Sequence, residues 1–97
     1  MVNEAAMRSV VQYIESEPET WDQRYVSRSG RMCLAGIACH LAGIRVDVLT
    51  SDLLFAAGRR LLGLTPPQAD RLFMWHGHPA TVSQLKEEIT AITGMEW

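Results

Sequence analysis

The stretch that decides the fold reads Cys33-Leu-Ala-Gly-Ile-Ala-Cys-His-Leu-Ala-Gly43. It contains no proline, few polar atoms and, when His40 is neutral, no charge. A helix that is apolar all round is buried on every side, so other helices must surround it. The uncharged run from Met32 to Ile44 has about 13 residues, fewer than the roughly 20 that span a bilayer. We therefore predict a fully apolar central helix over residues 32–43 in a compact all-α domain.

Helical spacing gives this central helix three faces. The bulky face consists of Leu34, Ile37, Leu41 and Ile44. The small-residue face consists of Ala35, Ala38, Cys39 and Ala42, and the remaining face of Cys33, Gly36, His40 and Gly43. Small side chains let neighbouring helices approach closely, which offsets the helix-weakening effect of the two glycines.

Four further amphipathic segments are bounded by helix start and stop signals, so about five helices are expected. Caps, capping boxes, glycines and prolines set their boundaries, which are Asn3 to Pro18, Thr50 or Ser51 to Gly63, Thr65 to Gly77, and Thr81 to Gly94. Apolar spacing selects the core residues, which are Met7, Val10, Val11, Ile14, Leu54, Ala57, Leu61, Ala69, Leu72, Phe73, Val82, Leu85, Ile89 and Ile92.

The segments that join the helices are short. Thr20-Trp-Asp-Gln23 has the form of a capping box and predicts one short helical turn. Short extended links are expected near residues 24–27 and 45–49. Because the chain has 97 residues and shows no internal repeat or low-complexity segment, residues 1–97 are predicted to form a single helical domain.

The charge balance limits the classes of partner. The chain has 9 basic and 11 acidic residues and a net charge of -2, which argues against nucleic acid and anionic membranes as partners. The first residues lack the basic and apolar regions of a signal peptide, and we expect a cytoplasmic protein without membrane insertion.

Residues of metal-ligand type occur at unsuitable spacings. Cys33 and His40 share a helix face but lie about 10 Å apart along its axis, too far for one zinc ion. His76 and His78 would need a third ligand from elsewhere in the chain. An apolar setting raises the pKa of a thiol, and no nucleophile or phosphate-loop motif is present. We therefore predict no enzyme, no cofactor and no metal, with a metal-binding helical domain as the third alternative.

A small DNA-binding transcriptional regulator is the second alternative. The last two helices are the best helix-turn-helix pair, but their connection exceeds the usual 3–4 residues. The would-be recognition helix carries two glutamates and only one lysine. A phosphate backbone would therefore repel this helix. The loop residues Arg24, Arg28 and Arg31, with Tyr25 between them, form a basic patch whose simpler explanation is a solvated loop.

Protein binding is favoured by the aromatic run Phe73-Met-Trp-His-Gly-His-Pro79. Successive helical residues diverge by about 100°, so Phe73, Met74 and Trp75 cannot share one buried face. Tryptophan and methionine are enriched at interfaces, although Trp75 and Trp97 could equally cap the edge of the core. We predict a non-enzymatic protein-interaction module whose binding residues are Met74, Trp75, His76, His78, Trp97, Arg24 and Arg28.

The sequence also resembles small helical proteins of actinobacteria and their phages. The shared pattern is a Cys-x-x-Gly-x-Ala helix, here from Cys33, that follows Trp21-Asp-Gln23 and precedes Gly-Leu-Thr-x-x-Gln-Ala-x-x-Leu-Phe, here from Gly63. The resemblance covers about residues 6 to 94 and carries no catalytic residues. It implies a phage-encoded or phage-derived protein that binds a host cytoplasmic protein, in growth inhibition or superinfection exclusion. A homodimer is left open.

Overall fold

The computed structural model describes residues 1–22, 27–28, 31–74 and 81–97, with the backbone alone for Ser27, Arg28 and Arg31. Within these ranges the fold is all-α and compact, with a radius of gyration of 11.9 Å. The helices are α1 (Glu4–Ser16), α2 (Leu34–Leu41), α3 (Ser51–Leu62), α4 (Pro66–Phe73) and α5 (Val82–Thr93). The minor elements are the 3-10 turns η1 (Pro18–Thr20) and η2 (Val46–Val48) and the strands β1 (Ser27–Arg28) and β2 (Arg31–Met32).

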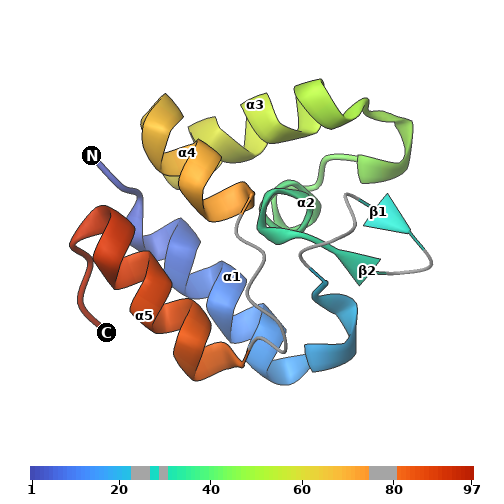
Figure 1. Cartoon of the computed structure of the whole chain (residues 1–97). Helices are drawn as coiled ribbons and strands as arrows, with labels where there is room; N and C mark the ends of the chain where they lie inside the picture. Colours follow the sequence, from blue (N-terminus) through green and yellow to red (C-terminus); the bar gives the residue numbers. More distant parts are fainter. Residues whose placement is uncertain (23–26, 29–30, 75–80) are drawn as a thin grey trace.

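The predicted apolar helix is confirmed as a buried element that packs against α3 and α1, whereas α4 and α5 pack mainly against those two helices and each other. Figure 1 shows α2 nearly end-on, with α3 crossing above it, α1 and α5 side by side below, and the small antiparallel hairpin of β1 and β2 to one side. All residues from Leu34 to Cys39 are buried. None of the described helices combines the length and apolar composition needed to cross a membrane.

The prediction that residues 32–43 are helical is wrong at both ends, and the prediction that they are buried throughout is wrong at the C-terminal end. Cys33 is the N-cap of α2, and Ala42 follows its last turn. His40, Ala42 and Gly43 are exposed, and the side chain of Leu41 is 44% exposed. The apolar composition of a helix shows which of its residues can be buried, whereas the surrounding helices determine which of them are buried.

Small residues allow a close approach between α2 and α3. This agrees with the prediction that the small-residue face of α2 lets a neighbouring helix come close. Gly58 of α3 lies against Ala35, and a Cβ atom added at Gly58 would lie 2.8 Å from the Ala35 Cβ and 2.9 Å from its Cα. The inward line of α3 is Leu54, Gly58 and Leu62, while the predicted core residues Ala57 and Leu61 are half-buried. The tight contact at Gly58 therefore sets the rotation of α3 about its axis.

One residue joins the start of α1 to the end of α3. The Asn3 side chain caps α1 as predicted, because its Oδ1 accepts a hydrogen bond from the Ala6 N–H at 3.2 Å. Its backbone N–H donates to the Leu62 carbonyl at 2.8 Å, and its Nδ2 donates to the Leu61 carbonyl at 3.2 Å. Next to this junction Gly63 ends α3 with a φ of 66°, which glycine adopts without strain.

The two predicted capping boxes are confirmed. In α4, Thr65 and Gln68 exchange side-chain and backbone hydrogen bonds, and Thr81 does the same with Gln84 in α5. The Nε2 of Gln68 also donates to the Ile92 carbonyl at 3.3 Å, which ties α4 to α5. Gly94 ends α5 in the left-handed region, as expected.

Two boundary predictions need correction, and each of them falls partly outside the described residues. Helix α4 ends at Phe73 instead of reaching Gly77, and residues 75–80 lie outside the described ranges. The helical turn expected over Thr20–Gln23 lies earlier, at η1, because Pro18 suits its first position and Trp21 makes an isolated bridge with Met32.

The two predicted extended links have different outcomes. The link expected at 45–49 is instead the 3-10 turn η2, in which Asp47 forms an ion pair of 2.9 Å with the N-cap residue Arg45. Of the link expected near 24–27, Ser27 lies in β1, and residues 24–26 fall outside the described part of the chain.

Candidate functional site

The predicted binding residues are distributed over separate parts of the fold. Met74 directly follows α4 and is 56% exposed, and Trp97 follows α5 and is 41% exposed. The backbone of Arg28 lies in β1, opposite Arg31. The remaining predicted binding residues lie outside the described ranges, and they are Arg24, Trp75, His76 and His78.

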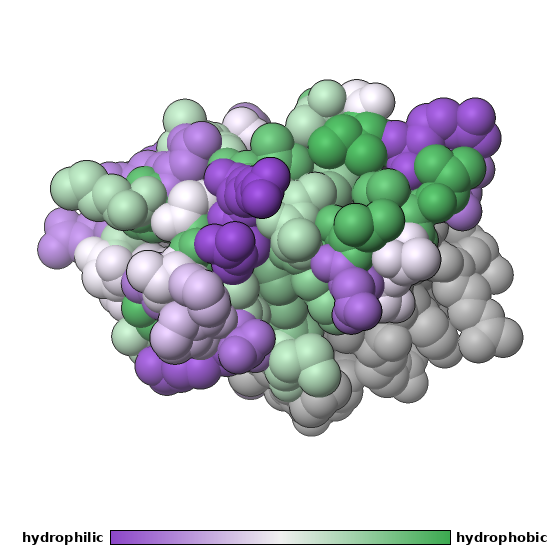
Figure 2. Space-filling model, turned by 90° about the horizontal axis from the view of Figure 1, so that it is seen from above, coloured by the Kyte–Doolittle hydropathy of each residue, from purple (hydrophilic) through white to green (hydrophobic). Residues whose placement is uncertain are grey.

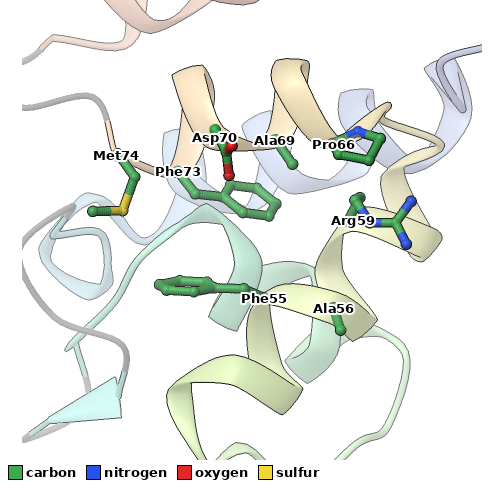
Figure 3. A pocket seen from close by; sticks show the side chains of 8 residues that line it. All are labelled: Phe55, Ala56, Arg59, Pro66, Ala69, Asp70, Phe73 and Met74. Atoms are coloured by element: carbon green, nitrogen blue, oxygen red, sulfur yellow. The ribbon is translucent and has the colours of Figure 1, made fainter.

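A groove between α3 and α4 brings Met74 together with residues that the sequence had not indicated as binding residues. The groove has a volume of about 190 Å³. Figure 3 shows its lining, which consists of Phe55, Ala56 and Arg59 from α3 and of Pro66, Ala69, Asp70, Phe73 and Met74 from α4 and its C-cap. We call it the α3–α4 groove.

Helical spacing explains why these side chains face one another. The lining positions of α4 recur at intervals of three and four residues from Pro66 to Phe73, and those of α3 repeat one turn apart at Phe55 and Arg59. The short link from Gly63 to Thr65 makes α3 and α4 neighbours in space. Their two stripes therefore form the walls of one groove.

Two aromatic rings form the apolar base of the groove. Phe55 and Phe73 stack with ring centroids 5.7 Å apart and an interplanar angle of 26°. Phe73 is buried, Phe55 is half-buried, and the Met74 side chain is exposed beside them. Ala56 and Ala69 are too short to fill the space in front of the rings. The groove thus offers polarizable apolar surface that a partner side chain can cover.

The charges at the groove are limited to one on each wall. Arg59 lines the α3 side and Asp70 the α4 side, while the other lining residues are uncharged. Asp70 is exposed and Arg59 is half-buried. Within the described ranges, no ion pair joins either of these side chains to another residue. Both charges therefore remain available to a molecule that binds there.

The face seen from above carries further apolar surface. Figure 2 shows hydrophobic side chains that reach this surface between hydrophilic ones. Among the described residues, Val48 of η2 and Leu53 of α3 are exposed by 66% and 58%. The groove is thus one part of an interrupted apolar surface on the α3 side.

Trp97 has an intramolecular role. Its Nε1–H donates a hydrogen bond to the Lys86 carbonyl at 3.1 Å. The Arg8 guanidinium and the Lys86 ammonium each lie 5.5 Å from the centroid of its ring. A nitrogen of Arg8 also donates to the Glu96 carbonyl at 2.6 Å. The last residues of the printed sequence are therefore anchored to both α1 and α5.

The two cysteines are buried free thiols. Burial raises the pKa of both Cys33 and Cys39, although the N–H groups of Ala35 and Gly36 partly oppose this for Cys33. The Cys39 thiol makes a weak hydrogen bond of 3.8 Å to the Leu54 carbonyl. A neutral buried thiol is a poor nucleophile, so these groups serve packing better than catalysis.

The described residues contain no cluster of three or more histidine, cysteine, aspartate or glutamate side chains that could hold a metal ion. His76 and His78 lie outside those residues, so the metal alternative built on them is neither supported nor opposed. Comparisons with protein families, curated proteins and solved structures found no match.

Proposed function

We propose that this protein is a non-enzymatic interaction module that binds an apolar segment of another protein in the α3–α4 groove. The observation that carries the proposal is the stacked pair Phe55 and Phe73, which lies at the base of a groove that no described segment fills. Exposed Met74 adds an adaptable apolar side chain next to it. Aromatic residues and methionine of this kind are enriched at the centres of protein interfaces.

The setting of this proposal comes from the sequence resemblance. Under this proposal the protein is encoded by a phage or derived from one, acts in the cytoplasm of an actinobacterial host and modulates one host protein. Burial raises the pKa of the Cys33 and Cys39 thiols, which opposes a nucleophilic role for these two groups and supports a non-enzymatic function. Growth inhibition and superinfection exclusion are the biological outcomes that fit such binding.

The test places a large side chain in the α3–α4 groove and leaves the buried residues unchanged. Ala56 is exposed and lines the groove, so Ala56→Trp should block it while leaving the buried residues in place. Ala91→Trp adds the same ring to an exposed position of α5 and is the matched control. Affinity purification from a mycobacterial lysate, with quantitative mass spectrometry, should recover a partner with the wild type and the control. The Ala56→Trp variant should recover at least about tenfold less, since interface centres carry most of the binding energy.

Two results of this experiment would refute the proposal. One is the absence of any partner that the wild type recovers above the background of an unrelated bait. The other is a partner whose recovery is the same for Ala56→Trp and Ala91→Trp, because the α3–α4 groove would then not be its site.

A DNA-binding regulator remains the second candidate, and one observation favours it. The hairpin register pairs Arg28 directly with Arg31, which brings two basic positions together. A gel shift at physiological salt distinguishes the two functions. Specific binding that is lost with Arg28→Ala and Arg31→Ala would support the regulator, whereas the interaction module predicts no shift.

A further inference from the structure

The two walls of the α3–α4 groove carry opposite charges, and this restricts what can occupy it. We infer that the occupant is an amphipathic α-helix of a partner protein, with an acidic residue on the flank that faces Arg59 and a basic residue on the flank that faces Asp70. This inference rests on the proposed function and specifies the chemistry of the partner.

The form of the groove favours a helix over an extended segment. Both walls are helices, and their backbone groups are used internally, as where the Met74 N–H donates to the Asp70 carbonyl at 3.1 Å. A peptide that binds as an added strand depends on backbone hydrogen bonds to a free strand edge, which these walls do not offer. A helix makes its own backbone hydrogen bonds and presents only side chains.

The length of the groove matches a short row of helical side chains. Its α4 wall runs from Pro66 to Phe73, which at 1.5 Å per residue is about 10.5 Å or two turns. Over that distance a partner helix presents apolar residues at positions i, i+3 or i+4, and i+7. The central residue of such a row would lie against Phe55 and Phe73, opposite the short side chains of Ala56 and Ala69.

The charges define the flanks of that helix. Arg59 on α3 attracts an acidic flank, and Asp70 on α4 attracts a basic one. Because neither side chain is ion-paired within the described part of the chain, a partner need not displace an existing bridge. Complementary rim charges contribute mainly to specificity. A helix with the same sign of charge on both flanks would meet repulsion at one wall in either orientation.

The experiment uses three synthetic helical peptides with the same leucine row. One carries glutamate on one flank and lysine on the other, the second carries glutamate on both flanks, and the third carries lysine on both. The wild type should bind the mixed peptide about threefold to tenfold more tightly than the other two, as expected for partly exposed ion pairs. Fluorescence anisotropy of labelled peptides measures the dissociation constants.

Charge-reversal variants test each wall separately. Arg59→Glu makes both walls acidic and should shift the preference to the lysine peptide, whereas Asp70→Lys makes both walls basic and should shift it to the glutamate peptide. Arg60→Glu reverses an exposed charge on α3 that does not line the groove, and it should retain the preference for the mixed peptide. Circular dichroism confirms that each variant is folded.

The outcomes separate this inference from the proposed function. If a folded wild-type protein binds none of the three peptides, or binds all three equally, the inference is overturned. The proposed function is decided independently by the Ala56→Trp comparison with the natural partner. Preferences that follow the charge reversals at both walls would establish the chemistry of the partner helix.

Discussion

Gly58 is the position at which a single methyl group should disturb the whole fold. It lies in the middle of α3 and contacts Ala35 of the central helix. A Cβ atom at this position would lie 2.8 Å from the Ala35 Cβ, 2.9 Å from its Cα and 3.3 Å from its carbonyl oxygen. Two of these atoms belong to the backbone of α2, so no flexible side chain can move aside. In Gly58→Ala the two helices must separate.

Two opposing terms set the size of the effect. Carbon atoms pack at about 3.5 to 4.0 Å, so α2 and α3 must move apart by about 0.7 Å or more. Overpacking of this kind typically costs about 1–3 kcal/mol, and contact with the backbone favours the upper end. Alanine is about 1 kcal/mol better than glycine inside a helix. We therefore expect Gly58→Ala to lower the free energy of unfolding by about 2 kcal/mol.

Urea unfolding followed by circular dichroism measures this change, and the melting temperature should fall by about 8–16 °C. The Ala56→Gly variant gives the helix-propensity term at an exposed position of the same helix. Adding Ala35→Gly to Gly58→Ala removes one clashing carbon, so the two substitutions should be coupled. If Gly58→Ala is as stable as the wild type, Gly58 does not set the separation of α2 and α3.

Three further predictions concern other contacts. Gly63→Ala should lower the stability clearly more than Gly94→Ala. Both glycines have a positive φ, but only a Cβ atom at Gly63 would contact backbone atoms, since it would lie 2.6 Å from the Met1 carbonyl oxygen. Equal melting temperatures of the two variants would contradict this prediction. Trp97→Leu should lower the free energy of unfolding by about 1–2 kcal/mol through lost cation–π contacts and the indole hydrogen bond, and an unchanged urea midpoint would oppose it. Burial raises the pKa of both thiols above their usual value of 9.0, so the thiols ionise at lower pH in the unfolded chain than in the folded protein. The contribution of the neutral thiols to stability is therefore fully present below about pH 9 and is lost as the pH rises above it. Between about pH 8 and about pH 10 the wild type should therefore lose more stability than Cys39→Ala, and parallel losses would argue against it.

Several helix ends could be predicted because their signals are local. Asn3, Thr65 and Thr81 cap helices in the structure as their sequence context predicted. Gly63 and Gly94 end helices because each adopts a positive φ. Such signals act within one turn and need no knowledge of the rest of the chain.

Two of the predictions that failed, on the burial of α2 and on the inward line of α3, depend on contacts between distant segments. The sequence of α2 does not show that its burial ends before His40, because α1 and α3 are the helices that bury it. The inward line of α3 passes through Gly58 because Ala35 leaves room for nothing larger. The spacing of apolar residues limits which faces of a helix can be buried. The packing of the neighbouring helix then determines which of these faces is buried.

The α3–α4 groove combines both kinds of information. Sequence reasoning singled out Met74 and noted that it could not share one buried face with Phe73 and Trp75. The aromatic partner Phe55 and the charge of Arg59 come from a different helix, and only the packing of α3 against α4 places them opposite Phe73 and Asp70.

The all-α fold, the apolar helix α2 and the helix ends at Asn3, Gly63, Thr65, Thr81 and Gly94 follow from the sequence alone, because propensity, capping and periodicity act over neighbouring residues. The tertiary structure alone decided how far each helix is covered, which small residues touch, and where the groove lies. Those properties depend on the distances and rotations between helices, which are set by the fit of all side chains at once.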